Sequence, residues 1–435
     1  MKAQRTIILL FFFLSCFLKA SIAFEDFISV TFQERDGSFV VSIDDNEWFH
    51  SSSFRFYASG SWQNLSTVDT VRRVNGTDDV LGDFLSINIT WVSEEYHVIH
   101  TSLQTFYEHK NLVIFTQEVP RGASFTNASN PFLPGGLRTM DPGNYPPLLT
   151  FPSFAGGQLE TLRYLTWHSR MINIESGTNI LDSSFPRGTN EPLNEGVGGK
   201  GIQGFSTGPV VLFDENFTCL VIAPMDNFKS AVSFVSTHES QGNLVWENGV
   251  SSEIKEIPPG FLHRTILVAG QGITATLDKW GHFMRASHKT NRKPFLDLDK
   301  NVNWLSYWTD NGAYLSGGSW NETGGGGKYV NEESFLQVTK GLRDQGLLKA
   351  VKIWQLDDWW YSGKGGCYSS CVANWSLSER SFPSGLQSLS KKLGIPWLLY
   401  VPFWCPKNIF SDKFRWVKSV RHNNIIEDFV EPHPE

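Results

Sequence analysis

Two adjacent aspartates, Asp357 and Asp358, end an apolar run in the segment AVKIWQLDDWWY at residues 350–361, and three tryptophans flank the pair. An aromatic ring can stack on the C–H face of a sugar, and a carboxylate can accept hydrogen bonds from two neighbouring hydroxyls. These residue types therefore suit a carbohydrate site. The spacing is equally consistent with an alternative, in which the aspartates cap a loop and the tryptophans pack in a core.

Tryptophans are concentrated in this part of the chain, because ten of the sixteen lie within residues 304–416. Core packing would account for Trp304 and Trp397, which stand inside apolar runs. It accounts less well for five tryptophans at or near predicted strand ends, which are Trp308, Trp354, Trp359, Trp360 and Trp404. We therefore expect exposed aromatic surface where the strands end.

Residues 24–272 predict a β domain. Short runs rich in Val, Ile, Phe and Thr alternate with polar turns, as in FISVTF, SFVVSI and NLVIFTQEV. The runs PVVLF and TCLVIAPM flank the polar residues 214–217, which predicts a hairpin. Because no helical periodicity of useful length interrupts this region, we expect a large antiparallel β-sandwich.

Residues 273–294 predict a linker helix between this domain and the next. Apolar residues at positions 273, 277, 280 and 284 recur at the spacing of one helical face. Thr274 is the expected N-cap, and the polar segment before Pro294 is expected to end the helix.

Residues 295–435 change to an α/β pattern. Strands are predicted at 301–308, where the strand should be buried, and at 350–356 and 395–403. A helix capped by Asn331 and ended by Gly346 lies between the first two, and a helix at 386–393 lies between the last two. A third helix is predicted at 413–420.

This β–α–β–α–β order with near-regular spacing predicts a parallel sheet. It suits either a doubly wound sheet or the first three units of an incomplete (β/α)8 barrel of the TIM type. Both architectures bind their ligands at the carboxyl ends of the strands, where the aspartates and tryptophans gather.

The segment QLDDWWY resembles the second barrel strand of the clan D glycoside hydrolases, which carry an Asp-Asp-x-Trp sequence there. That clan includes the α-galactosidases and the raffinose synthases. SYWTDNGAY, at residues 306–314, is similar to the clan's aromatic-rich first strand. The resemblance implies a retaining glycosidase that acts on α-linked sugars, with α-galactosides as substrates. Galactosyl transfer of the raffinose-synthase type and non-catalytic glycan binding by a secreted protein are the alternatives.

The resemblance also implies roles for single residues. Asp357 and Asp358 would bind hydroxyls of the terminal sugar, Trp308 and Trp404 would form the walls of the pocket, and Asp310 would lie at its base. The nucleophile and the acid/base of a retaining enzyme lie about 5–5.5 Å apart. In this clan they come from the fourth and sixth barrel strands, which would lie beyond the last residue given. We therefore assign no catalytic residue and expect the sequence to be a fragment of a longer enzyme.

The first 23 residues predict a cleaved signal peptide, because basic residues precede a 12-residue apolar stretch and a small-residue cleavage site. That stretch is shorter than the roughly 20 residues of a membrane span, so we expect a secreted or lumenal protein without a stable span. Asn-x-Ser/Thr sequons predict glycosylation at Asn64, Asn75, Asn88, Asn127, Asn216, Asn321 and Asn374. We expect a local disulfide between Cys367 and Cys371 in such an oxidising compartment.

Other partners and cofactors are not expected. Loss of the leader's three basic residues would lower the formal net charge from −7 to −10, which disfavours nucleic acid and anionic membrane surfaces. The segments GVGGKG and GGGGK lack the context of nucleotide-binding loops, and DLDKN lacks the Gly and Glu of a calcium loop. We therefore expect a carbohydrate partner, with no cofactor and no metal.

Overall fold

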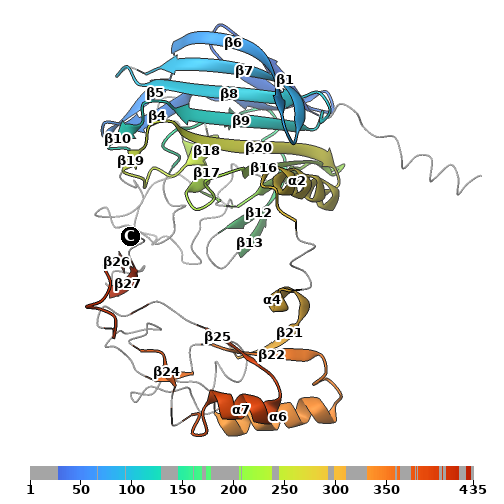
Figure 1. The fold of residues 1–435 in the computed structure, drawn as a ribbon. Helices are drawn as coiled ribbons and strands as arrows, with labels where there is room; N and C mark the ends of the chain where they lie inside the picture. The colour runs from blue at the N-terminus through green and yellow to red at the C-terminus, as the bar shows by residue number, and fades with distance from the viewer. Residues whose placement is uncertain are drawn as a thin grey trace, which may run out of the picture. The chain divides into compact units, whose positions relative to one another are not determined.

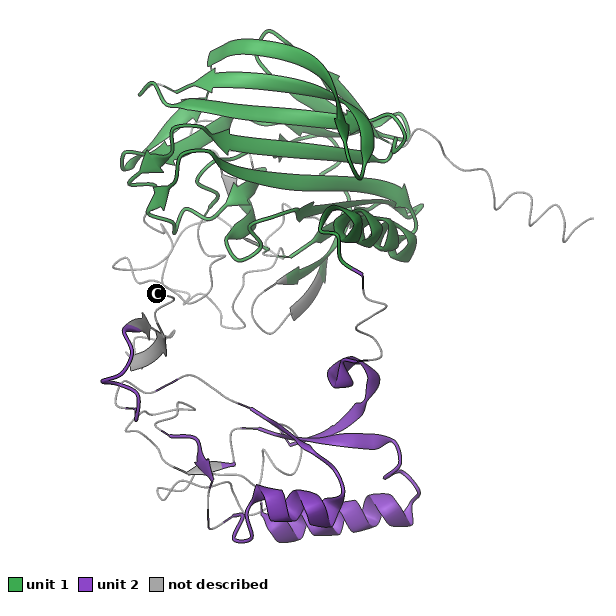
Figure 2. Ribbon diagram, viewed as in Figure 1, with its two compact units in different colours: residues 1–137, 141–290 green, residues 138–140, 291–435 purple. Residues whose placement is uncertain are grey.

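The computed structural model describes residues 28–432, apart from residues 66, 94, 129–145, 160, 169–172, 178–204, 207, 238–243, 292–297, 310–330, 358–359, 363–373, 378, 380, 401–403, 405–407 and 421–427. The chain divides into two compact units (Figure 2). One comprises residues 1–137 and 141–290, and the other comprises residues 138–140 and 291–435.

The first unit contains two large sheets whose neighbouring strands pair antiparallel (Figure 1). One sheet has the strand order β1 (Ile28–Phe32), β2 (Phe39–Ile43), β3 (Asn46–Ser51), β11 (Ser153–Ala155), β18 (Leu244–Val250), β17 (Ala231–Thr237) and β14 (Phe205–Ser206). The other has the order β13 (Asn173–Gly177), β12 (Arg163–His168), β15 (Val210–Phe213), β16 (Thr218–Pro224), β20 (Phe261–Gln271), β9 (Leu112–Val119), β8 (Val98–Phe106), β7 (Gly82–Val92) and β6 (Thr67–Asp78). A short hairpin joins β4 (Phe54–Ala58) to β5 (Ser61–Leu65). A small two-stranded sheet pairs β10 (Ala123–Ser124) with β19 (Glu256–Ile257), which lies far along the chain.

The two sheets face each other across one apolar core. The ring of Phe39 in β2 lies with its centroid 5.4 Å from that of Phe115 in β9. Val113 and Phe115 point into this core, while Leu112 and Ile114 pack on the other face of the sheet with Phe283 of α2 (Ile273–Ser287). β9 is therefore buried on both faces, which explains its continuous apolar run. The layered antiparallel arrangement agrees with the expectation for residues 24–272.

Two local predictions in this unit have different outcomes. The hairpin between β15 and β16 is confirmed, and the carboxylate of Asp214 closes it by accepting hydrogen bonds from the amides of Asn216 and Thr218 at 2.9 and 2.8 Å.

The expected cap of α2 is wrong. Gly272, not Thr274, is the N-cap, because the chain leaves β20 at a φ of 85° that glycine adopts without strain.

The second unit is built around a parallel sheet with the order β21 (Leu305–Trp308), β22 (Val351–Leu356) and β25 (Trp397–Leu399). Helices α6 (Glu332–Asp344) and α7 (Leu386–Leu393) connect these strands and pack on one face of the sheet. Two connecting helices on one face occur both in a barrel and in one half of a doubly wound sheet, so this arrangement is common to the two expected architectures. The residues that the structure describes do not show a closed barrel.

The signals predicted for the two helices are confirmed. The side chain of Asn331 accepts a hydrogen bond from the amide of Ser334 at 2.9 Å and caps α6. Gly346 follows the end of α6 at a φ of 73°, and Gly394 caps α7 in the left-handed conformation. Such ends need a residue without a Cβ.

The predicted buried strand at 301–308 is wrong in extent and in burial. Asp299 caps a short helix, α4 (Lys300–Asn303), by accepting a hydrogen bond from the amide of Asn301 at 2.9 Å. β21 begins only at Leu305, which is 67% exposed.

The predicted helix at 413–420 is also wrong. Residues Trp416–Val420 form β26, which pairs antiparallel with β27 (Asp428–Pro432). The β-branched residues Val417 and Val420 favour a strand once a partner is present. A further hairpin pairs β23 (Tyr361–Ser362) with β24 (Ser376–Leu377).

Candidate functional site

The carboxyl ends of the three parallel strands in the second unit form the candidate site. Trp308 of β21 is in register with Gln355 of β22, and Leu356 of β22 is in register with Leu399 of β25. The three strand ends therefore lie side by side in the sheet (Figure 1). This is the edge at which α/β sheets bind their ligands.

Alternation of side chains separates two faces of this sheet. Trp354 of β22 is fully buried against Phe335 of α6, and the ring centroids lie 5.0 Å apart. Tyr307 of β21 lies on the same face, with its ring centroid 4.6 Å from that of Trp354. Trp308 directly follows Tyr307, and Asp357 comes three residues after Trp354. Because successive side chains alternate, both belong to the opposite face.

Asp357 is held in place by the neighbouring strand. Its backbone amide donates a hydrogen bond to the hydroxyl of Thr309 at 3.0 Å, and that hydroxyl donates to the carbonyl of Gln355 at 3.3 Å. Asp357 is 7% exposed and Thr309 is fully buried. A carboxylate in such surroundings forms stronger hydrogen bonds than it would in open water.

Two exposed aromatic residues lie at the ends of the strands on either side of β22. Trp308 is 47% exposed, which is unusual for an indole in a parallel strand. Tyr400 directly follows β25, is 41% exposed, and donates its amide to the carbonyl of Leu356 at 2.8 Å. Sequence reasoning missed Tyr400. Side chains alternate along residues 397–400. Because Trp397 faces the helices, this alternation would have placed Tyr400 on the same face as Asp357.

Trp404 belongs to an aromatic cluster. Its ring centroid lies 4.3 Å from that of Trp375, 5.2 Å from that of Phe410 and 6.1 Å from that of Trp416. Among the described residues, the rings that contact Trp404 do not include Trp308. The structure thus brings Asp357 and Trp308 to adjacent strand ends and gives Trp404 other aromatic neighbours.

Three tryptophans differ from the sequence-based expectation. Trp354 and Trp360 are core residues, with 0% and 5% of their surface exposed. The indole of Trp360 also donates a hydrogen bond to the carbonyl of Tyr400 at 2.8 Å. Trp304, expected in the core, is 36% exposed. Burial on one face of the sheet, rather than distance from the strand end, separates the packing tryptophans from the exposed ones.

Several predicted residues cannot be placed. The predicted residues outside the described part of the structure are Asp310, Asp358, Trp359, Cys367, Cys371, Asn321 and the leader at 1–23. Four of the other sequon asparagines are exposed, namely Asn64, Asn75, Asn88 and Asn216. Two are half-buried, namely Asn127 and Asn374. Cys219 is a buried free thiol, and burial raises its pKa to about 11.

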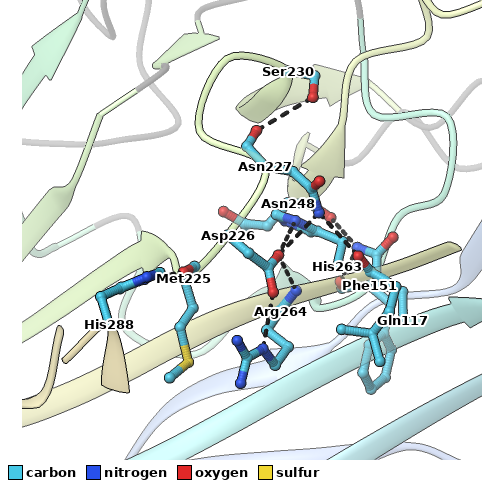
Figure 3. Close-up of polar contacts among 11 residues, drawn as sticks. Gln117, Phe151, Met225, Asp226, Asn227, Ser230, Asn248, His263, Arg264 and His288 are labelled. Carbon is cyan, nitrogen blue, oxygen red and sulfur yellow. Dashed lines mark hydrogen bonds and ion pairs between the residues drawn. The ribbon is translucent and has the colours of Figure 1, made fainter. Parts of the chain in front are cut away.

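A separate polar cluster lies in the first unit, where residues 225–230 connect β16 to β17 (Figure 3). One carboxylate oxygen of Asp226 accepts a hydrogen bond from the Arg264 guanidinium at 2.8 Å. The other accepts from the Arg264 amide at 2.8 Å and lies 3.0 Å from Nδ1 of the buried His263. Burial raises the pKa of the Asp226 carboxyl, but hydrogen bonds from His263 and Arg264 outweigh it, so this pKa lies below its usual value. The cluster anchors the connection between the two sheets.

Neither a metal centre nor a membrane helix is found in the described part of the chain. No group of three or more His, Cys, Asp or Glu side chains there is arranged to hold a metal ion. No helix among those residues is long and apolar enough to cross a bilayer.

Comparison with known proteins bears on this fold. No protein-family model matches the chain, and no curated protein is a significant match. Among solved structures, an α-N-acetylgalactosaminidase from Bifidobacterium bifidum is similar, with a TM-score of 0.51 and 10% identity over 93% of this chain and 64% of that one. The same enzyme in a Gal-NHAc-DNJ complex gives a TM-score of 0.52 and 10% identity over 92% and 62% of the two chains. The chain shares its fold with a glycoside hydrolase.

A glycoside hydrolase family 97 enzyme from a Pseudoalteromonas species also matches, with a TM-score of 0.46 and 12% identity over 85% of this chain and 52% of that one. The chain therefore spans about half to two thirds of the length of these glycoside hydrolases.

Proposed function

We propose that the sheet face carrying Asp357 and Trp308 binds the terminal sugar of an α-linked glycoside, and that the protein is a glycoside hydrolase-like protein for α-galactosides. The observation that carries this proposal is the occurrence of the buried Asp357 and the half-exposed Trp308 at the ends of two adjacent parallel strands. The fold shared with an α-N-acetylgalactosaminidase supports the class of substrate. The resemblance of QLDDWWY to clan D supports galactosides within that class.

The residues of this face suit binding. The Asp357 carboxylate accepts hydrogen bonds from neighbouring hydroxyls of the sugar, and Trp308 offers a flat apolar surface to its C–H face. Tyr400 extends that surface across β25. Asp310 and Asp358, which directly follow Thr309 and Asp357, are proposed to complete the hydrogen bonds to the ring.

The reaction proposed is hydrolysis with retention of configuration. It requires a nucleophile and an acid/base with carboxyl groups about 5–5.5 Å apart, and we assign these roles to no residue of this chain. Asp357 and Asp358 are adjacent in the sequence, so we do not assign them as the two carboxylates on the two sides of a glycosidic bond. The leader and the sequons support a secreted or lumenal glycoprotein.

The test is calorimetric titration of the whole chain with methyl α-D-galactopyranoside and, separately, with methyl α-D-glucopyranoside. We expect the galactoside to bind more tightly. Asp357→Asn should weaken its binding at least about tenfold, since a hydrogen bond to a charged group contributes about 1.5–3 kcal/mol. Trp308→Ala should weaken it by a similar factor. The stacking of a nucleic-acid base on an aromatic side chain, which covers a comparable area, contributes about 1–3 kcal/mol.

Matched controls come from the same unit. Asp344→Asn removes an exposed carboxylate of α6, and Trp304→Ala removes an indole at the other end of β21. Both should bind the galactoside as the unmodified chain does. Equal affinities for all four variants would refute the site.

Turnover assays distinguish an enzyme from a non-catalytic glycan-binding protein. Release of nitrophenol from nitrophenyl α-galactoside would support hydrolysis, and formation of a new galactoside when an acceptor sugar is added would support transfer. Tight binding of the galactoside without turnover of any α-glycoside would favour the glycan-binding alternative.

A further inference from the structure

A cavity of about 550 Å³ opens in the second unit at the amino-terminal ends of β21, β22 and β25. Its lining includes Trp304, Val351 and Ile395, which precede or begin these strands, and residues that end α6 and α7. β22 has six residues, so about 20 Å of strand separates this cavity from Asp357. Sites for small molecules commonly have volumes of about 300–1,000 Å³.

The cavity combines an apolar interior with a cationic opening. Leu393 and Ile395 are 3% and 6% exposed and form its buried part. Arg343, Lys349 and Lys352 also line it and are exposed. Among the described lining residues there is no Asp, Glu, Asn or Gln. The cavity therefore lacks the side-chain acceptors that the hydroxyls of a neutral sugar need.

The cations are only partly explained by the fold. Arg343 lies in the last turn of α6, where the helix dipole favours a positive charge. Lys349 lies in the turn after α6, and Lys352 lies within β22, so neither has this explanation. In the described part of the chain, no carboxylate forms an ion pair with any of the three. Lys300 is not part of the lining, but its Nζ lies 5.1 Å from the centre of the Trp304 ring.

We propose that this basic cavity binds a small organic anion with an apolar ring. The ring stacks on the Trp304 indole and contacts Leu393 and Ile395, and the anionic group pairs with Lys349 and Lys352. Such a ligand brings the acceptor oxygens that the lining lacks. The proposal does not depend on the sugar site, because the two sites lie at opposite ends of β22.

The test uses naphthalene-2-sulfonate as the probe and 2-naphthol, which is uncharged at pH 7, as its neutral analogue. Titration calorimetry of the whole chain should show saturable binding of the sulfonate and much weaker binding of the naphthol. The double variant Lys349→Gln/Lys352→Gln should raise the dissociation constant of the sulfonate about fivefold, as expected for two exposed ion pairs. It should also reduce the dependence of that constant on salt.

Two further variants separate the cavity from the rest of the surface. Trp304→Ala should weaken binding of the sulfonate, and Lys413→Gln, which removes an exposed cation outside the cavity lining, should leave it unchanged. The proposal is overturned if the sulfonate does not bind at millimolar concentration, if the naphthol binds as tightly, or if the double variant and Lys413→Gln have the same affinity. Binding of galactoside by the double variant reports separately on the sugar site.

Discussion

The hydroxyl of Thr309 accepts a hydrogen bond from the backbone amide of Asp357 at 3.0 Å, across 48 residues of sequence. This bond joins the end of β21 to the end of β22. It fixes the position of the one predicted sugar-binding carboxylate that the structure describes. The loss of this bond should therefore affect ligand affinity as well as stability.

The variant Thr309→Val tests this relationship, because valine has the shape of threonine without its hydroxyl. It would leave a buried amide without a side-chain acceptor, and we expect a loss of about 1–3 kcal/mol in the free energy of unfolding. Binding of methyl α-D-galactopyranoside should weaken as well, because the bond from Thr309 that positions the Asp357 backbone is lost. Thr309→Ser keeps the hydroxyl and should preserve most of the affinity. If valine and serine variants bind the galactoside equally well, the hydroxyl does not position Asp357.

The Asp226 cluster predicts a pH-dependent contribution to the stability of the first unit. The native state holds the pKa of Asp226 below its usual value, so this contribution is complete above the unfolded pKa of about 3.9. It is lost as the pH falls through the lower folded pKa. At pH 6 we expect Asp226→Asn to be less stable than the unmodified chain by about 1–3 kcal/mol.

Urea unfolding at pH 6 and at pH 3 measures this effect. The difference between Asp226→Asn and the unmodified chain should shrink at pH 3. Asp45→Asn changes an exposed carboxylate and is the control for general charge effects. An Asp226→Asn deficit of the same size at both pH values would contradict the assigned role of the carboxylate.

Short-range signals made much of the second unit predictable. Asn331 caps α6 through a residue three positions away, and Gly394 ends α7 through its own backbone conformation. Neither depends on distant parts of the chain. The order of strands and helices followed from these local signals, and with it the position of Asp357 at a strand end.

Long-range contacts decided what the sequence could not show. Trp354 and Trp308 stand at similar places in their strands, yet one is fully buried and the other is 47% exposed. The difference comes from Phe335 on α6, which covers only one face of the sheet. Residues 416–420 form a strand because residues 428–432 pair with them. Such partners cannot be read from the segment itself.

Two neighbouring glycines provide a matched test of a close backbone contact. Gly156 and Gly157 both have a φ of 61°. A Cβ on Gly156 would have nothing within 4 Å, whereas a Cβ on Gly157 would lie 2.3 Å from the carbonyl oxygen of Trp48. That oxygen accepts a hydrogen bond from the amide of Gln158 at 2.9 Å, so it cannot move freely.

Gly156→Ala should cost about 1–2 kcal/mol, which is the penalty of a left-handed conformation for a residue with a Cβ. Gly157→Ala should cost a further 1–3 kcal/mol or so, because the methyl group overpacks the contact with Trp48. The two urea midpoints compare the variants directly. Equal midpoints would show that the chain relieves the contact without cost.

A buried ion pair links residues that are 192 positions apart in the first unit. The Arg55 guanidinium donates two hydrogen bonds to the Glu247 carboxylate, at 2.9 and 2.8 Å, and the Glu247 side chain is fully buried. Arg55→Met would leave this buried charge without its guanidinium, and we expect a loss of about 3–5 kcal/mol in the free energy of unfolding. The exposed pair of Arg73 and Glu34 is the control, and Arg73→Met should cost less than about 1 kcal/mol.

The double variant Arg55→Met/Glu247→Met separates the value of the pair from the cost of leaving the buried Glu247 charge without its guanidinium. Removing both charges also removes the desolvation penalty, and apolar side chains of similar volume can then pack in the core. We therefore expect the double variant to be more stable than Arg55→Met alone, as measured by urea unfolding. If the double variant is the less stable of the two, the carboxylate of Glu247 stabilises this unit through contacts other than Arg55.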